Sequence, residues 1–153
     1  MFQLSKEAEI FLKDNGDKKI VFTNGCFDIL HSGHISYLND AKALGDVLFI
    51  GLNSDSSVKA LKGSERPIND EYERKFILEN LKAVDFVEVF SDETPLELIK
   101  KVDPDFLVKG GDWAVEQIVG HEFVQKNGGI VKSLPFKDGF STTNIIEKIK
   151  TLV

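Results

Sequence analysis

Short apolar runs alternate along the chain with segments in which apolar residues recur at helical spacing. The apolar runs predict five buried strands, over residues 19–23, 47–52, 85–90, 105–108 and 130–134. The helical segments cover 5–14, 33–44, 56–61, 70–81, a stretch opening at Thr94-Pro95, 115–127 and 141–152, with Ser5, Asn69 and Ser141 as expected N-caps. This alternation predicts an α/β fold, a Rossmann-like doubly wound sheet of about five parallel strands with helices on both faces.

The pattern continues from end to end without a repeat or a low-complexity tract. We therefore expect a single domain over residues 1–153, with an N-terminal helix in residues 1–17 and the Rossmann-like core in residues 18–153. A chain of 153 residues that is 42% hydrophobic is long enough to bury one core of ordinary size.

Most of the candidate binding and catalytic residues lie in the segments that follow four of the predicted strands. These segments are residues 24–34, 53–55, 109–113 and 135–143. In an open parallel sheet the carboxyl ends of the strands share one edge, and ligands bind there, where the strand order reverses. The sequence therefore predicts one site built from these four segments.

Charge and cysteine content narrow the range of partners. The chain has 19 basic and 25 acidic side chains and a net charge of -6, which disfavours general binding to nucleic acid or to anionic membranes. No apolar stretch approaches the ~20 residues that cross a bilayer, and the start MFQLSKEAEIF lacks the features of a secretory signal. The single cysteine, Cys26, excludes an internal disulfide. We expect a cytoplasmic protein.

Two histidines lie three residues apart at the expected start of a helix. His31 and His34 can face one spot together with the free N–H groups of that helix start, and Gly33 keeps the spot open. Such a spot suits a phosphate. Zinc is an alternative, but Cys26 and the distant His121 do not complete a recognisable ligand set. Both histidines can also be hydrogen-bonded turn residues without a ligand.

Two further segments suggest phosphate contacts, each with a plainer alternative. In Lys109–Asp112 the glycines allow close approach of the backbone, the lysine supplies charge and the aspartate can accept from a hydroxyl, although Gly-Gly loops are usually turns. Ser141–Thr143 can bind phosphate at a helix start, or simply cap the helix. The chain has neither GxxxxGK[ST] nor GxGxxG, so a P-loop kinase and a nicotinamide oxidoreductase lack support.

The remaining candidates are basic and aromatic side chains. Lys62, Arg66 and Arg74 place positive charge in and after the loop KGSERPIN, with solvated surface charge as the alternative. Trp113 and Phe27 can flank a base or a sugar, although such aromatic residues more often belong to the core.

Four motifs together resemble a known family. They are NGCFD at Asn24–Asp28, HxGH at His31–His34, KGGD at Lys109–Asp112 and DGFSTTN at Asp138–Asn144. The chain resembles the cytidylyltransferase-like nucleotidyltransferases over Lys19–Ile149, and within them the heptose 1-phosphate adenylyltransferase branch. HxGH after a strand is fairly specific for the superfamily, and its combination with KGGD and STTNII favours the heptose branch.

The resemblance implies transfer of AMP from ATP to D-glycero-β-D-manno-heptose 1-phosphate, giving ADP-heptose and pyrophosphate. It implies catalytic roles for His31, His34 and Lys62. It implies nucleotide or phosphate binding by Asn24, Gly25, Cys26, Phe27, Gly33, Arg74, Lys109, Gly110, Gly111, Asp112, Ser141, Thr142 and Thr143. We further expect Asn53, Asp55 and Trp113 to contact the sugar phosphate. Ile146 stands where many relatives carry a basic residue, which leaves one phosphate contact unassigned.

The resemblance also implies cofactors and partners. Mg²⁺ is expected to accompany ATP, without direct ligation by protein side chains. A homodimer is expected, as is a separate sugar kinase, because no sugar-kinase segment is recognisable in these residues. Three alternatives remain: a cytidylyltransferase acting on glycerol 3-phosphate, an adenylyltransferase acting on a flavin or a pantetheine phosphate, and a non-catalytic nucleotide-binding or sensor domain.

Overall fold

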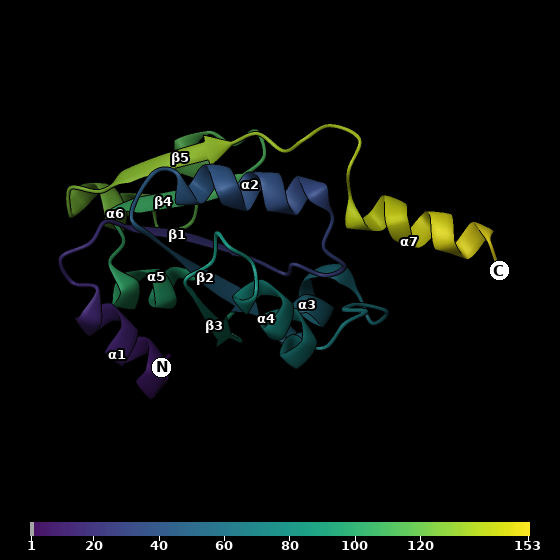
Figure 1. Cartoon of the computed structure of the whole chain (residues 1–153), viewed down its shortest axis with the longest axis horizontal. Helices are drawn as coiled ribbons and strands as arrows, with labels where there is room; N and C mark the ends of the chain where they lie inside the picture. The colour runs from purple at the N-terminus through teal and green to yellow at the C-terminus, as the bar shows by residue number, and fades with distance from the viewer. Residues whose placement is uncertain (1) are drawn as a thin grey trace.

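The core of the protein is a sheet of five parallel strands (Figure 1). The structure is a computed structural model that describes residues 2–153. The strands are β1 (Ile20–Gly25), β2 (Val47–Asn53), β3 (Phe86–Phe90), β4 (Phe106–Gly110) and β5 (Ile130–Leu134), in the order β3-β2-β1-β4-β5. The predicted fold class is confirmed.

Helices cover both faces of the sheet. They are α1 (Lys6–Asp14), α2 (Ser32–Lys42), α3 (Asp55–Lys62), α4 (Glu71–Glu79), α5 (Leu96–Val102), α6 (His121–Lys126) and α7 (Thr142–Thr151), with a short 3₁₀ helix η1 at Val115–Gln117. On one face α1, α5 and α6 pack against Phe22, Phe49 and Leu107. On the other, α2 and α4 pack against Val21, Leu48 and Val108. Two buried layers therefore hold the sheet in place.

Two local predictions were wrong. The helix expected over residues 115–127 is split into η1 and α6, because Gly120 adopts a left-handed φ of +90° between them. The N-cap of α4 is Asp70 and not Asn69, since the Asp70 carboxylate accepts from the backbone N–H of Glu73. Asn69 instead donates its backbone N–H to Asp28.

The strand order reverses between β1 and β4. The chain runs outward from β1 to β2 and β3, then crosses to the other side for β4 and β5. The ladder between β1 and β4 consists of Val21↔Phe106 and Phe22↔Leu107, although both strands continue for three more residues, to Gly25 and Gly110. Ligands of doubly wound sheets bind at such a reversal, outside the carboxyl ends of the strands.

Helix α7 extends away from the sheet at its carboxyl edge (Figure 1). It is the last element of the chain, and none of its residues is buried. Ser141 caps it as predicted, accepting from the backbone N–H of Asn144. No helix within residues 2–153 is long and apolar enough to cross a membrane.

Candidate active site

The site begins in the loop that joins β1 to α2. Phe27 and Ile29 both adopt left-handed φ angles of 48°, so the backbone turns sharply on either side of Asp28. Asp28 is 2% exposed, and its carboxylate accepts from the backbone N–H groups of Ile68 at 2.7 Å and Asn69 at 3.0 Å. Arg66 pairs with the same carboxylate at 3.2 Å. Asp28 therefore ties the basic loop before α4 to the loop that leads into α2.

The predicted pair of histidines forms the start of α2. His31 is the N-cap, and its Nδ1 accepts from the backbone N–H of Gly33 at 3.1 Å. His34 reaches back, so that its Nδ1 accepts from the backbone N–H of His31 at 3.2 Å. The centres of the two rings are 3.9 Å apart. The structure thus brings both imidazoles together at a helix start, where each accepts from a backbone N–H group.

Burial shapes the acid–base behaviour of these rings. It lowers the pKa of His34 to about 4, helped by the neighbouring His31. Burial also lowers the pKa of His31, although that ring is more exposed than His34. Both side chains are therefore neutral at physiological pH.

A glycine separates the two histidines for steric reasons. A Cβ atom at Gly33 would lie 2.9 Å from the His31 ring and 3.2 Å from Cβ of Phe140. Phe140 stacks on the His31 ring, with 6.2 Å between ring centres. Phe140 was not predicted as part of the site. Its position shows that the segment before α7 folds over the start of α2.

The C-terminal motif meets the same loop. Thr142 Oγ1 donates to the carbonyl oxygen of Asp28 at 2.7 Å. Ser141 uses its hydroxyl as the N-cap of α7, whereas Thr143 is exposed at the first turn. The starts of α2 and α7 are therefore held together at one end of the sheet.

The segment after β4 carries a lysine that stands over an aromatic ring. Lys109 Nζ lies 4.9 Å from the centre of the Trp113 ring, and desolvation lowers the pKa of Lys109. Trp113 donates its indole N–H to the carbonyl of Gly110 at 3.0 Å and remains partly exposed. Gly111 has a left-handed φ of +118°, which suits glycine. Asp112 is exposed beside them.

Gly110 must lack a side chain because an aromatic ring covers it. A Cβ atom there would overlap the Phe136 ring. Phe136 also packs on Tyr37 of α2, with 5.5 Å between ring centres, and Tyr37 shares a 2.7 Å hydrogen bond with Thr23 of β1. A chain of contacts thus links the ends of β1 and β4 through the segment after β5.

Arg74 is placed differently from the predicted phosphate contact. Only 1% of the residue is exposed, so its guanidinium is not presented to a ligand in this structure. It donates to the carbonyl oxygens of Asn69, Cys26 and Asn53 and pairs with the Asp55 carboxylate at 2.8 Å. These bonds fasten α4 to the ends of β1 and β2.

Asn53 and Asp55, expected to contact the sugar phosphate, are engaged in the same network. Asn53 is buried and donates its side-chain amide to Ser57 Oγ at 2.8 Å. Asp55 is the carboxylate that pairs with Arg74. The polar groups of both residues are therefore bonded to protein atoms, while the Asp55 side chain stays 36% exposed.

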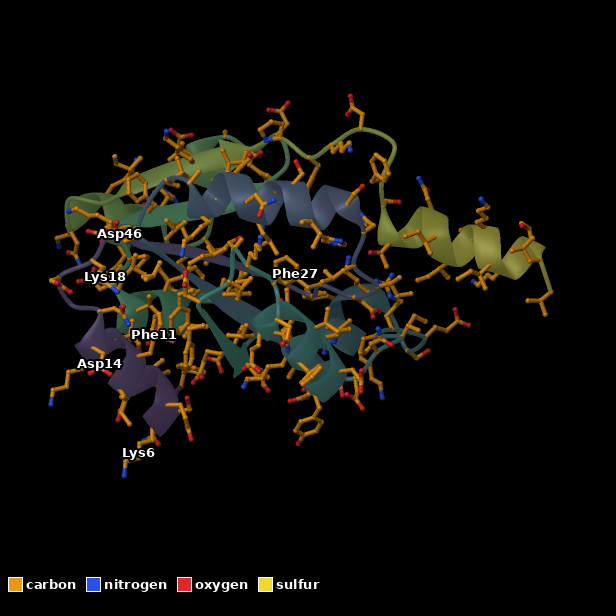
Figure 2. The ribbon with its side chains drawn as sticks, in the orientation of Figure 1. Lys6, Phe11, Asp14, Lys18, Phe27 and Asp46 are labelled. Carbon is orange, nitrogen blue, oxygen red and sulfur yellow. The ribbon has the colours of Figure 1, made fainter. Side chains whose placement is uncertain are left out.

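Several basic side chains lie near Cys26, in the loop after β1. Burial raises the pKa of Cys26, while the nearby charges of Lys62, Arg74 and Arg66 act to lower it. Lys62 is the exposed last residue of α3. Phe27, which follows Cys26 in the chain, packs in the core between α2 and α4 (Figure 2). Asn24 and Gly25 complete the end of β1.

The sequence reasoning missed three residues that organise this edge: Asp28, Phe136 and Phe140. Asp28 was visible only as the last letter of the NGCFD motif, and a single acidic residue in a loop carries no sign of burial. The two phenylalanines stand on either side of a polar, Gly-containing stretch. Their occurrence in an otherwise polar segment was the signal that the sequence offered.

No group of three or more His, Cys, Asp or Glu side chains in residues 2–153 is arranged to hold a metal ion. Mg²⁺ commonly uses one or two carboxylates together with substrate phosphates. The buried Asp28 carboxylate already has three partners, which leaves the exposed Asp112 as an acidic side chain of this edge with free oxygen atoms to offer. Asp112 therefore fits a Mg²⁺ ion that arrives bound to a triphosphate.

A cavity of about 340 Å³ lies elsewhere, lined by residues that include Lys18, Lys101 and Asp105. It is formed at the amino ends of the strands, on the side of the molecule where Lys18 and Asp46 are labelled in Figure 2. Because ligands of doubly wound sheets bind at the carboxyl ends, we do not assign the site to this cavity.

Comparisons with known proteins agree with the motifs. A family model described as cytidylyltransferase-like matches residues 22–148. The protein named Bifunctional protein HldE from Geotalea uraniireducens is 57% identical over 134 residues, which are 88% of this chain and 27% of that protein. The protein of the same name from Campylobacter jejuni serotype O:6 is 55% identical over 146 residues, or 95% of this chain and 31% of that protein. The chain thus spans less than a third of these relatives.

Solved structures show the same architecture. The lipopolysaccharide core biosynthesis protein from Thermoplasma volcanium is 32% identical, with a TM-score of 0.62 over 78% of this chain and 97% of that one. A pantothenate synthetase from Thermus thermophilus also reaches a TM-score of 0.62, over 99% of this chain and 70% of that one, at 16% identity. The second likeness concerns the fold alone.

Proposed function

The chain belongs to the cytidylyltransferase-like family, and from this we propose that it transfers AMP from ATP to a sugar 1-phosphate. We propose D-glycero-β-D-manno-heptose 1-phosphate as the acceptor, with ADP-heptose and pyrophosphate as the products. The relatives named HldE and the lipopolysaccharide core biosynthesis protein support the heptose branch, as do the KGGD and STTNII motifs.

One observation supports phosphate chemistry above all others. The hydrogen bond from Thr142 to Asp28 holds the start of α7 against the loop that leads into α2. We propose that the two imidazoles, the start of α7 and the exposed Thr143 share one spot that binds a triphosphate. Lys62 and Lys109 supply positive charge from the ends of α3 and β4.

The proposed reaction makes one bond and breaks one. An oxygen atom of the sugar phosphate attacks the α-phosphorus of ATP, and the bond from that phosphorus to the bridging oxygen breaks, releasing pyrophosphate. Because the second pKa of a phosphate monoester is about 6, the attacking oxygen is already anionic at neutral pH and needs no general base. The protein has to offset the repulsion between two anionic substrates.

Individual residues receive roles from their positions. We propose that His31 and His34 contact the triphosphate and the charge that develops at the α-phosphorus, and that Lys62 lies between the two substrates. Thr143, Lys109 and the exposed Asp112 contact the phosphates or the ribose. When bound with ATP, Mg²⁺ neutralises part of the triphosphate charge.

Other predicted residues act at one remove. We propose that Arg74, Asn53 and Asp55 position the loops, because their polar groups are bonded to protein atoms. Trp113 keeps an exposed ring beside Lys109 and is proposed to stack on the sugar or the base.

The partners follow from the same proposal. A sugar kinase must supply the sugar 1-phosphate, and we propose a cytoplasmic enzyme that draws on cellular ATP. We also propose a homodimer, which light scattering coupled to size exclusion checks directly through the molar mass.

Pyrophosphate release tests the function. Each of ATP, CTP, GTP and UTP is supplied with and without heptose 1-phosphate, and in parallel with glycerol 3-phosphate, flavin mononucleotide and phosphopantetheine. We expect release only from ATP with the heptose phosphate. Turnover with CTP alone contradicts the adenylyl assignment, and turnover with another acceptor contradicts the heptose assignment. Nucleotide binding without any release indicates a non-catalytic domain.

A further inference from the structure

The hydrogen bonds at the start of α2 fix more than the positions of the two rings. Each imidazole places Nδ1 against a backbone amide, His31 against Gly33 N–H and His34 against His31 N–H. A backbone N–H only donates, so each Nδ1 must accept and cannot carry a proton while the bond exists. A neutral ring then has its one proton on Nε2.

We propose that His31 and His34 both act as neutral imidazoles, each locked by the backbone in the tautomer that presents an Nε2–H donor to phosphate. This deepens the proposed function and rests on it for the identity of the acceptor. It assigns the histidines a role as donors of hydrogen bonds that is distinct from the cationic role of Lys62 and Lys109.

Protonation of either ring is opposed by its surroundings. A proton on Nδ1 would meet the amide N–H that now donates to that atom, and the positive charge would lie at the positive end of the α2 dipole. The rings also face each other at 3.9 Å, so charge on one repels charge on the other.

The groups packed around the rings offer no compensation. Phe27 lies beside His34, and Phe140 lies beside His31 with Lys137 over its ring. The nearest acidic side chain of the same loop, Asp28, is occupied by Arg66, Ile68 and Asn69. The lowered pKa values of both histidines agree with this geometry.

A fixed neutral donor has a functional advantage. Free imidazole interconverts between two tautomers, and only one of them would point a donor at the phosphates. A backbone that selects this tautomer in advance avoids reorganisation during the reaction. The charge compensation then comes from Lys62 and Lys109, so the proposed reaction does not require protonation of either imidazole.

The third histidine of the chain is an internal reference. His121 Nδ1 lies 2.9 Å from the carbonyl oxygen of Ile118, which only accepts, so this nitrogen must carry a proton. The structure therefore places His121 in the opposite tautomer from His31 and His34, or in the imidazolium form.

Nitrogen NMR of the free protein tests the proposal. Long-range ¹H–¹⁵N spectra at neutral pH distinguish a protonated ring nitrogen from an accepting one. We expect His31 and His34 to show an accepting Nδ1 and a protonated Nε2, and His121 to show a protonated Nδ1. An Nδ1–H tautomer or an imidazolium at either His31 or His34 at neutral pH overturns the proposal.

Two substitutions separate the helix-capping role of each histidine from its role as an Nε2–H donor. In His31→Asn the side-chain oxygen still caps α2, and in His34→Gln it still accepts from the N-cap N–H, as in a capping box. Neither keeps a ring Nε2–H. We expect thermal midpoints close to that of the parent and losses of ~10²- to 10³-fold in kcat, of the size seen when one oxyanion-hole donor is removed. Full activity in both variants overturns the donor role.

The two proposals fail in different ways. If no nucleotide supports pyrophosphate release but the spectra show Nε2–H at both rings, the proposed function is wrong and the tautomer assignment stands. If turnover occurs but the spectra show Nδ1–H at either ring, the function stands and the tautomer assignment is wrong.

Discussion

Thr142 Oγ1 and the carbonyl oxygen of Asp28 are 2.7 Å apart, although 114 positions separate them in the chain. Asp28 uses its backbone for this contact and its carboxylate for Arg66, Ile68 and Asn69. One residue thus joins three segments: the start of α7, the basic loop before α4 and the loop that leads into α2. We propose that binding of a triphosphate at this point depends on all three being in place.

The Thr142→Val substitution keeps the shape of the side chain and removes the donor. The net loss of one hydrogen bond is about 1 kcal/mol, and we expect the KM for ATP to rise roughly 5-fold with a smaller effect on kcat. Steady-state kinetics measure both. Thr151→Val is the control, because Thr151 bonds the carbonyl of Lys148 at the far end of α7. Equal effects of the two substitutions would mean that the contact with Asp28 has no special role.

Replacing Asp28 by asparagine leaves Arg66 without its partner. The carboxylate is buried and accepts from two backbone N–H groups, so we expect the free energy of unfolding to fall by about 1–3 kcal/mol. Urea denaturation measures the change. Asp14→Asn on the exposed end of α1 controls for loss of a carboxylate. An unchanged midpoint in the Asp28 variant contradicts the anchoring role.

Arg74→Met distinguishes a positioning residue from a phosphate ligand. Its guanidinium is buried and bonds four protein acceptors, so removal leaves Asp55 and three carbonyl groups short of a partner. We expect a loss of about 3–5 kcal/mol of stability, as for other broken buried pairs. Calorimetry or urea denaturation checks this, with Lys75→Met as the control, because it removes a partly exposed cation that pairs with Glu79 on the same helix. A variant that is fully stable but fails to bind ATP supports direct phosphate contact instead.

The low pKa of His34 predicts a dependence of stability on pH. The folded value is about 4 against a reference of 6.5, so between these pH values the unfolded chain binds a proton that the folded protein does not. The stability gained by keeping His34 neutral in the folded protein is fully present above pH 6.5 and is lost as pH falls toward 4. Thermal midpoints from pH 7.5 to about 4 should therefore decline less in His34→Gln than in the parent. Parallel curves contradict the assignment.

The fold was predictable from the sequence because each buried strand is a short apolar run and each helix has a regular apolar face. β2, buried at every position, is the clearest case. The split of the predicted helix at Gly120 was not visible, since a glycine within a helical pattern does not reveal its φ angle. Nor does a sequence order the strands of a sheet.

The candidate site was predictable as a set of motifs, whereas the function of each polar residue within it was harder to assign. HxGH lies at a helix start because strand β1 ends just before it, and that was expected. Arg74 follows a basic loop, and on sequence alone a buried arginine there cannot be told from one that faces phosphate. Its four protein acceptors come from segments far apart in the chain, as does the contact between Thr142 and Asp28.

The sheet contains a seam. Two residue pairs join β1 to β4, whereas six join β1 to β2 and five each join β2 to β3 and β4 to β5. The backbone ladder therefore consists of two plates, β3-β2-β1 and β4-β5, joined along a narrow strip at the amino-terminal part of β1 and β4. A small rotation of one plate against the other costs the fewest backbone bonds at that strip. Such a rotation would widen or narrow the carboxyl edge, where we propose that ATP binds.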